Sequence, residues 1–81
     1  HMEPEVKNNE DKGRYEIKLE EEYAFTEYRY HNDRYYFIHT EVPPQYEGQG
    51  IGSKLIKFAL DDVVKKGKKI IPWCKFVAVY I

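Results

Sequence analysis

The sequence lacks several features that would point to particular classes of protein. It has one cysteine in 81 residues, which excludes an internal disulfide and a cysteine-based zinc site; we predict no metal site and expect a reducing, cytoplasmic location. No apolar run approaches the roughly 18–20 residues that span a bilayer, and no signal peptide is recognisable. We therefore expect no membrane partner.

Net charge is also low, but it is unevenly distributed. The formal total is -1, yet residues 1–50 hold 12 acidic and 6 basic side chains, whereas residues 51–81 hold 2 and 7. An acidic first half would repel phosphates, so we expect no nucleic-acid partner. The basic second half instead indicates a smaller charged ligand there.

What the chain does contain is enough apolar material for one domain, which we assign to residues 3–81. Hydrophobic residues make up 42 % of the sequence, and eight tyrosines supply much of the bulk. His1 and Met2 are interpreted as a vector remnant. The last residue, Ile81, lies in an apolar stretch, so we expect the final helix to be truncated.

The first half shows the period of β-strands. Polar and apolar residues alternate over 14–19, 23–30 and 34–42, with short polar connections between them. In the last of these runs, Phe37, His39 and Glu41 are predicted to share one face of the strand. A short edge strand over residues 5–8 completes an antiparallel meander of three to four strands.

The period then changes to that of a helix. Apolar residues recur at helical spacing over 51–66, Gly67 is placed to end the helix, and residues 68–71 resume as a strand. A final helix is predicted over 75–81. Strand, helix and strand make one parallel βαβ crossover, so the fold class is α+β with a mixed, mostly antiparallel sheet.

Two prolines mark where the parallel strands should part. Pro43 and Pro72 each remove a backbone donor at the carboxyl end of their strand, and a crevice is expected between those ends. Trp73 is expected to pack under the crossover helix or to shield this crevice.

A glycine-rich loop leads directly into the helix. Gly48, Gly50 and Gly52 allow backbone amides to converge on an anion, and the helix N-terminus adds unpaired N–H groups. The order Gly52-Ser53-Lys54 does not fit a P-loop, and the glycine spacing does not fit a dinucleotide fingerprint. Phosphate binding and a plain flexible strand-to-helix loop both remain open.

These residues resemble the GNAT superfamily of acyl-CoA-dependent N-acetyltransferases, particularly its minimal members. The family signature is Gln/Arg-x-x-Gly-x-Gly/Ala between a strand and a helix; Gly50 and Gly52 match it, and Glu47 replaces the usual Gln or Arg. The run His39-Thr40 and the stretch around Cys74 are similar too. The resemblance covers residues 14–80 and implies a GNAT-like acyl-CoA fold.

The resemblance also implies a pose for acetyl-CoA as cosubstrate. Its pantetheine arm would pair with the strand near Val42, and its pyrophosphate would lie on the loop amides. The implied binding residues are Val42, Gly48, Gln49, Gly50, Ile51, Gly52, Ser53 and Lys54.

Three residues are candidates for the chemistry. Cys74 is interpreted in three ways: as a small buried hydrophobe, as a nucleophile that takes the acetyl group, or as a lining residue of the acceptor pocket. His39 is either a base for that thiol or a structural residue. Glu41 is either the base in a direct transfer or a solvated strand residue. Tyr80 is the acid by analogy, with a place in the core as the alternative.

The predicted function is therefore transfer of an acetyl group from acetyl-CoA to an amine, either through Cys74 or directly. The alternative is a CoA-binding or protein-interaction domain of the same fold without turnover. The acidic first half suits a cationic amine as acceptor, whose identity the sequence does not specify.

Overall fold

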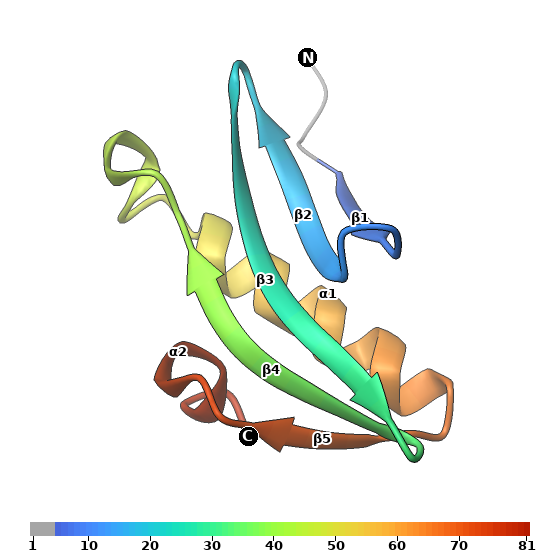
Figure 1. Ribbon diagram of the computed structural model, residues 1–81. Helices are drawn as coiled ribbons and strands as arrows, with labels where there is room; N and C mark the ends of the chain where they lie inside the picture. Colours follow the sequence, from blue (N-terminus) through green and yellow to red (C-terminus); the bar gives the residue numbers. More distant parts are fainter. Residues whose placement is uncertain (1–4) are drawn as a thin grey trace.

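The alternating residues of the first half form the antiparallel part of a sheet, as predicted. The computed structural model describes residues 5–81, and the expected vector remnant lies outside them. Five strands follow one another across the sheet in chain order (Figure 1). The first three are antiparallel neighbours: β1 (Val6–Asn9), β2 (Arg14–Leu19) and β3 (Glu22–His31).

A bulge in β4 (Arg34–Glu41) interrupts the alternation that the sequence predicted. Tyr28 of β3 pairs with Phe37, whereas the preceding Glu27 pairs with His39, so Ile38 is an extra residue in β4. An extra residue exchanges the two faces of a strand beyond it. The prediction that Phe37, His39 and Glu41 share one face is therefore wrong, because a strand's own period does not show where its partner's register shifts.

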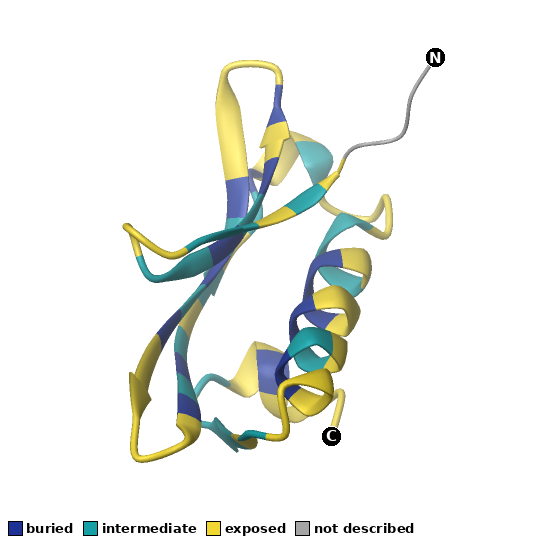
Figure 2. Cartoon of the chain, turned by 90° about the vertical axis from the view of Figure 1, so that its right-hand side faces the viewer, coloured by how far each residue is buried: buried dark blue, intermediate teal, exposed yellow. Residues whose placement is uncertain are grey.

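The helix α1 (Ile51–Lys65) lies across one face of the sheet and makes a second layer (Figure 2). Its buried residues are Leu55, Ile56, Ala59 and Val63. The predicted apolar spacing over 51–66 includes both Val63 and Val64, but Val64 is 63 % exposed, because it lies about 100° around the helix from Val63 and past the edge of the contact with the sheet. Gly67, with φ of 72°, donates its N–H to the carbonyl of Val64 at 2.9 Å and ends the helix as predicted.

The crossover returns the chain to β5 (Lys69–Pro72), which is parallel to β4, and the predicted α+β fold with a mixed sheet is confirmed. The two strands pair only as far as Phe37 and Pro72. Beyond that point Cys74 donates its N–H to the carbonyl of Phe37 at 2.9 Å, and the short helix α2 (Lys75–Ala78) begins. β4 therefore continues to Glu41 with α2, rather than β5, beside it.

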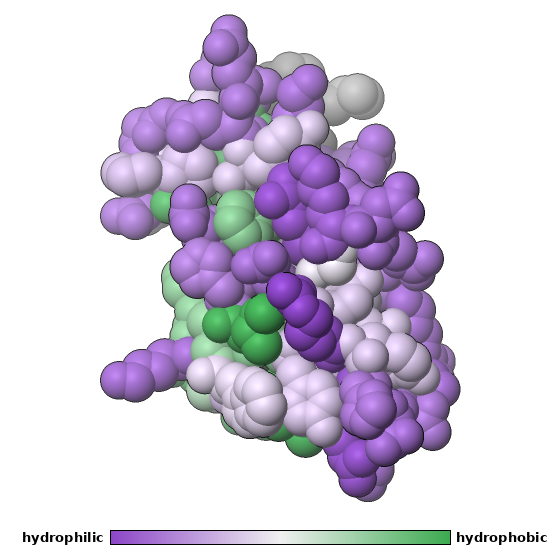
Figure 3. All heavy atoms as spheres, viewed as in Figure 1, coloured by the Kyte–Doolittle hydropathy of each residue, from purple (hydrophilic) through white to green (hydrophobic). Residues whose placement is uncertain are grey.

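Trp73 lies neither under α1 nor over the crevice, contrary to the prediction. It is 70 % exposed, and its ring centroid lies 4.9 Å from that of Tyr36, on the face of the sheet that α1 leaves uncovered. The residue after Pro72 continues the alternation of β5, which turns its side chain outward. Figure 3 shows this uncovered face, where a green apolar area continues into paler side chains beside and below it and polar side chains cover most of the remaining surface.

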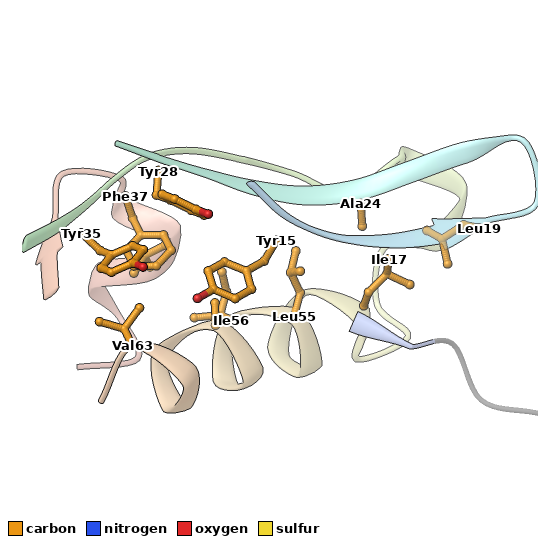
Figure 4. Close-up of a cluster of buried hydrophobic side chains, with 12 residues drawn as sticks. Tyr15, Ile17, Leu19, Ala24, Tyr28, Tyr35, Phe37, Leu55, Ile56 and Val63 are labelled. Atoms are coloured by element: carbon orange, nitrogen blue, oxygen red, sulfur yellow. The ribbon is translucent and has the colours of Figure 1, made fainter. Parts of the chain in front are cut away.

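The core fills the space between the sheet and α1 (Figure 4). Tyr15 is fully buried, and its hydroxyl points toward α1 and donates to Asp62 Oδ2 at 2.6 Å. Burial raises the pKa of Tyr15, and the hydrogen bond to Asp62 raises it further. Burial also acts to raise the pKa of Asp62, but the hydrogen bonds from Tyr15 and Lys66 outweigh it and leave that pKa below its usual value. This pair ties β2 to the helix.

Candidate functional site

A pocket of about 500 Å³ opens where β4 leaves the sheet. One wall is the end of β4, the second is the loop that leads into α1 together with its first turn, and the third is α2. The residues around it are Thr40, Glu41, Val42, Tyr46, Glu47, Gly48, Gly50, Ile51, Gly52, Ser53, Phe76 and Tyr80. The pocket therefore lies at the carboxyl end of β4, beside the start of the crossover helix.

Glycine is required in the loop for two different reasons. Gly48 and Gly50 adopt φ of 80° and 79°, and apart from each glycine and its two chain neighbours, no atom of the described residues lies within 4 Å of where a Cβ would stand on either. Their backbone conformation, and not crowding, dictates glycine there. At Gly52 a Cβ would lie 2.6 Å from Cζ of Phe76 and 3.5 Å from Cγ2 of Val42. The first turn of α1 thus touches α2 across the pocket.

The loop leaves an uncapped helix end facing the pocket. Gly50 is the N-cap of α1 and has no side chain to cap it, and the first intrahelical bond runs from the N–H of Lys54 to the carbonyl of Gly50 at 3.0 Å. The N–H groups before Lys54 have no partner within the helix. Together with the dipole of a 15-residue helix, these groups can hold an anion.

The outer side of the loop is held by acidic residues in the β2–β3 turn and at the start of β3. Tyr46 donates its hydroxyl to Glu20 at 2.6 Å, and Gln45 hydrogen-bonds Glu22. The hydrogen bond to Glu20 raises the pKa of Tyr46. The 3₁₀ turn Pro44–Tyr46 is thereby fixed, and with it the position from which the glycine loop starts.

Most of the predicted binding residues lie on the pocket wall. Val42, Gly48, Gly50, Ile51, Gly52 and Ser53 all line it. Gln49 and Lys54 do not; Gln49 donates its side-chain amide to the carbonyl of Gln45 at 3.3 Å, and Lys54 is exposed on α1. What these residues bind stays a prediction.

Cys74 lies next to the pocket wall and is not itself one of the lining residues. It is partly buried, packs against the core and precedes α2 as its N-cap. Its Sγ lies 3.5 Å from Oγ1 of Thr40, which does line the pocket. Thr40 Oγ1 is in turn 2.8 Å from Oγ1 of the fully buried Thr26.

The structure does not bring His39 and Cys74 together. His39 lies on the opposite face of β4 from Thr40, against the ring of Phe25, and its side chain is 53 % exposed. Its Nε2 is 3.0 Å from Oε1 of Glu41, which lies on the pocket wall. The structure therefore pairs His39 with Glu41, the other candidate base, while the roles of all three remain predictions.

Several wall residues were not singled out from the sequence. Thr40 and Phe76 are two of these residues. They were missed because neither threonine nor phenylalanine by itself indicates a functional site. Tyr80 lines the pocket and stacks on Phe76 with 6.4 Å between ring centroids, so the interpretation of Tyr80 as a core residue is wrong. The helical spacing of 76 and 80 could have indicated that these two rings lie together.

In residues 5–81 we find neither a metal centre nor a membrane-spanning helix. Within that part of the chain, no three His, Cys, Asp or Glu side chains are grouped so that they could hold a metal ion. Neither of its helices is long and apolar enough to cross a bilayer.

A comparison with known protein families finds a match. The family model described as GCN5-related N-acetyl-transferase matches residues 14–81. This range includes the whole pocket and every strand except β1. A search of curated proteins found no match.

Proposed function

The chain belongs to the GCN5-related N-acetyltransferase family, and on that premise we propose that it transfers an acetyl group from acetyl-CoA to an amine. The observation that supports the proposal most strongly is the pocket wall formed by the loop and first turn of α1. Gly48 and Gly50 leave their side of the backbone open, with no atom where a Cβ would stand. A pyrophosphate fits this surface because it needs close backbone approach and several N–H donors.

The chain's own residues then have defined tasks. The amides of 48–53 hold the phosphates, and the end of β4 near Val42, unpaired beyond β5, accepts the pantetheine arm. Acetyl-CoA supplies an activated acetyl thioester. Phe76 and Tyr80 close the pocket on the side of α2 and limit access of water to the thioester.

In the proposed route Cys74 carries the acetyl group. Its thiolate forms a bond to the acetyl carbon, and the bond from that carbon to the CoA sulfur breaks, so CoA leaves as a thiolate and takes a proton from solvent. The acceptor amine then attacks the same carbon, the bond to Cys74 Sγ breaks, and the amine proton passes to Glu41. His39, 3.0 Å from Glu41, orients that carboxylate.

The acceptor we propose is a cationic amine. Glu41 and Glu47 both lie on the pocket wall, and Glu20 and Glu22 are held close by through Tyr46 and Gln45. This acidic rim attracts a protonated amine and disfavours an anionic acceptor. The bound amine releases one proton to solvent before it attacks, and Glu41 accepts the second proton as the amide forms.

The test compares two glycines at opposite ends of α1. At roughly 100 times its Kd, acetyl-CoA should raise the melting temperature by more than about 10 °C, and amines should release CoA. Gly50→Asp should abolish both effects because it places a carboxylate where the phosphates bind. An acidic residue at a helix N-terminus does not by itself destabilise the helix, so unfolding is not the expected cause.

Gly67→Asp is the matched control. Gly67 has φ of 72° and equally open surroundings, so the backbone cost is similar, but it lies at the far end of the helix. It should keep the response to acetyl-CoA. A wild-type protein whose melting temperature does not respond to saturating acetyl-CoA would refute the proposed function.

A further inference from the structure

The bulge in β4 decides which side chain meets Cys74. With strict alternation, His39 would follow Phe37 on the face that packs against α1, and Thr40 would face outward. Because Ile38 is an extra residue, Thr40 instead pairs with the buried Thr26 and lies on the inner face, while His39 faces away beside Phe25. The pocket-lining side chain next to the sulfur is thus a hydroxyl and not an imidazole.

Three polar side chains form a chain of contacts at this point. Thr26 Oγ1, with its side chain fully buried, is 2.8 Å from Thr40 Oγ1, and Thr40 Oγ1 is 3.5 Å from Cys74 Sγ. Thr40 is the member that also lines the pocket. Groups that are buried and polar need hydrogen-bond partners, and these three supply them to one another.

The two hydroxyls suit both charge states of the sulfur. When Cys74 is a thiol, its S–H donates to Thr40, and the Thr40 O–H donates to Thr26. When Cys74 is a thiolate, the Thr40 O–H turns to donate to the sulfur, and the Thr26 O–H donates to Thr40. A hydroxyl can do this because its hydrogen rotates and its oxygen both donates and accepts.

We propose that Thr40 is a positioning residue for Cys74: it holds the sulfur at the edge of the pocket and donates a hydrogen bond to it when Cys74 is a thiolate. This inference rests on the proposed function, since the contact serves catalysis only if Cys74 receives the acetyl group. Thr40 therefore lies beside the Cys74 sulfur, where the sequence pattern predicted His39.

A purely structural Thr40 would behave differently. Cross-strand threonine pairs stabilise sheets, and losing one lowers the melting temperature whatever happens at the sulfur. The reactivity of Cys74 is the property that only a positioning role would change. It can be measured cleanly, because the chain has one cysteine and that side chain is partly exposed.

The experiment measures the rate at which iodoacetamide alkylates Cys74, by mass spectrometry at neutral pH and without acetyl-CoA. Two pairs of variants differ by one hydroxyl each: wild type against Thr40→Val, and Thr40→Ser against Thr40→Ala. A hydrogen bond to a charged sulfur stabilises the thiolate, which is the form that iodoacetamide alkylates. Its loss removes thiolate while the thiolate that remains is more nucleophilic, so we expect a net fall in rate of about threefold within each pair.

The outcomes separate this inference from the function on which it rests. Equal alkylation rates within both pairs would overturn the role of Thr40, and if one pair fails to fold, the other decides. Wild-type protein incubated with acetyl-CoA should gain one acetyl group, which Cys74→Ser removes and Thr40→Val makes slower to form. Turnover with no acetyl group on wild-type Cys74 would refute the proposed route itself, whatever the alkylation rates are.

Discussion

At the scale of single residues, the glycine at position 52 is explained by its neighbour across the pocket. A Cβ there would lie 2.6 Å from the ring of Phe76, so with the ring in this position only a hydrogen fits between the first turn of α1 and α2. The two glycines before it are explained by positive φ, which is a property of the loop alone. The same loop therefore combines a local and a long-range requirement.

This difference predicts what Gly52→Ala does. The ring of Phe76 is the far end of a partly exposed side chain and can move aside, and alanine improves the helix, so stability should change by less than about 1 kcal/mol. Because Phe76 lines the pocket, its displacement should weaken acetyl-CoA binding about tenfold, as measured by calorimetry. Adding Phe76→Leu should recover most of that loss; a double variant that binds as weakly as Gly52→Ala would contradict this account.

At the scale of elements, α1 has two adjacent valines with opposite surroundings. Val63 is fully buried between helix and sheet, whereas Val64 is 63 % exposed. The apolar pattern alone predicted that both valines are buried, because it depends on residue type only and does not show where the contact between α1 and the sheet ends. Their substitution provides a matched comparison within a single turn.

Val63→Ala should lower the free energy of unfolding by about 2 kcal/mol, because it removes two buried methyl groups and leaves a cavity. Val64→Ala should be neutral or stabilising by up to about 0.5 kcal/mol, since alanine is the better helix former. Urea denaturation of both variants measures this. Similar losses for the two would mean that α1 is rotated relative to the orientation described.

β4 shows how a single irregularity re-aims a strand. The bulge at Ile38 leaves Tyr35 and Phe37 in the core and then brings Thr40 to the same side. As a result His39 pairs with Glu41 on the outside, and Cys74 pairs with a hydroxyl on the inside. Bulges often occur beside functional sites for this reason.

At the scale of the whole molecule, the uneven charge of the chain is partly neutralised by folding. Lys68 of the basic half pairs with Asp33 of the acidic half at 2.8 Å, and Lys66 pairs with Asp62 at 2.9 Å. Hydrogen bonds to these carboxylates raise the pKa of both lysines. The total of the basic half thus overstates the positive field near the pocket.

The link between the two layers also predicts how stability depends on pH. The pKa of Tyr15 is raised in the folded state, first by burial and then by Asp62, so its contribution is fully present below the unfolded value of about 10 and is lost as pH rises above it. Tyr15→Phe should cost about 1 kcal/mol at pH 7 by removing the hydrogen bond. Above pH 10 the free energy of unfolding of Tyr15→Phe should fall less steeply with pH than that of wild type, the two slopes differing by about 1.4 kcal/mol per pH unit.

Urea denaturation from pH 7 to pH 11 checks this dependence. Tyr28 retains some slope in the variant, because burial raises its pKa as well. Tyr23→Phe, which removes an exposed hydroxyl, serves as the control. An identical slope in Tyr15→Phe and wild type would show that this tyrosine does not ionise on unfolding.

Much of the fold follows from the sequence alone, because its causes are local. Alternation gave β2 and β3, helical spacing gave α1, and the order of strand, helix and strand required the parallel pairing of β4 with β5. The glycines that open the loop were likewise predictable, since positive φ is a property of a residue and its immediate neighbours.

The tertiary structure alone decided the register of β3 with β4, and with it the exchange of His39 and Thr40. It also decided the approach of Phe76 to Gly52 and the hydrogen bond between Tyr15 and Asp62, two residues that are 47 positions apart. These features depend on which surfaces meet and by how much they are offset, and no local period encodes that offset. The chain thus determined where a site could be, whereas packing determined which side chains surround its sulfur.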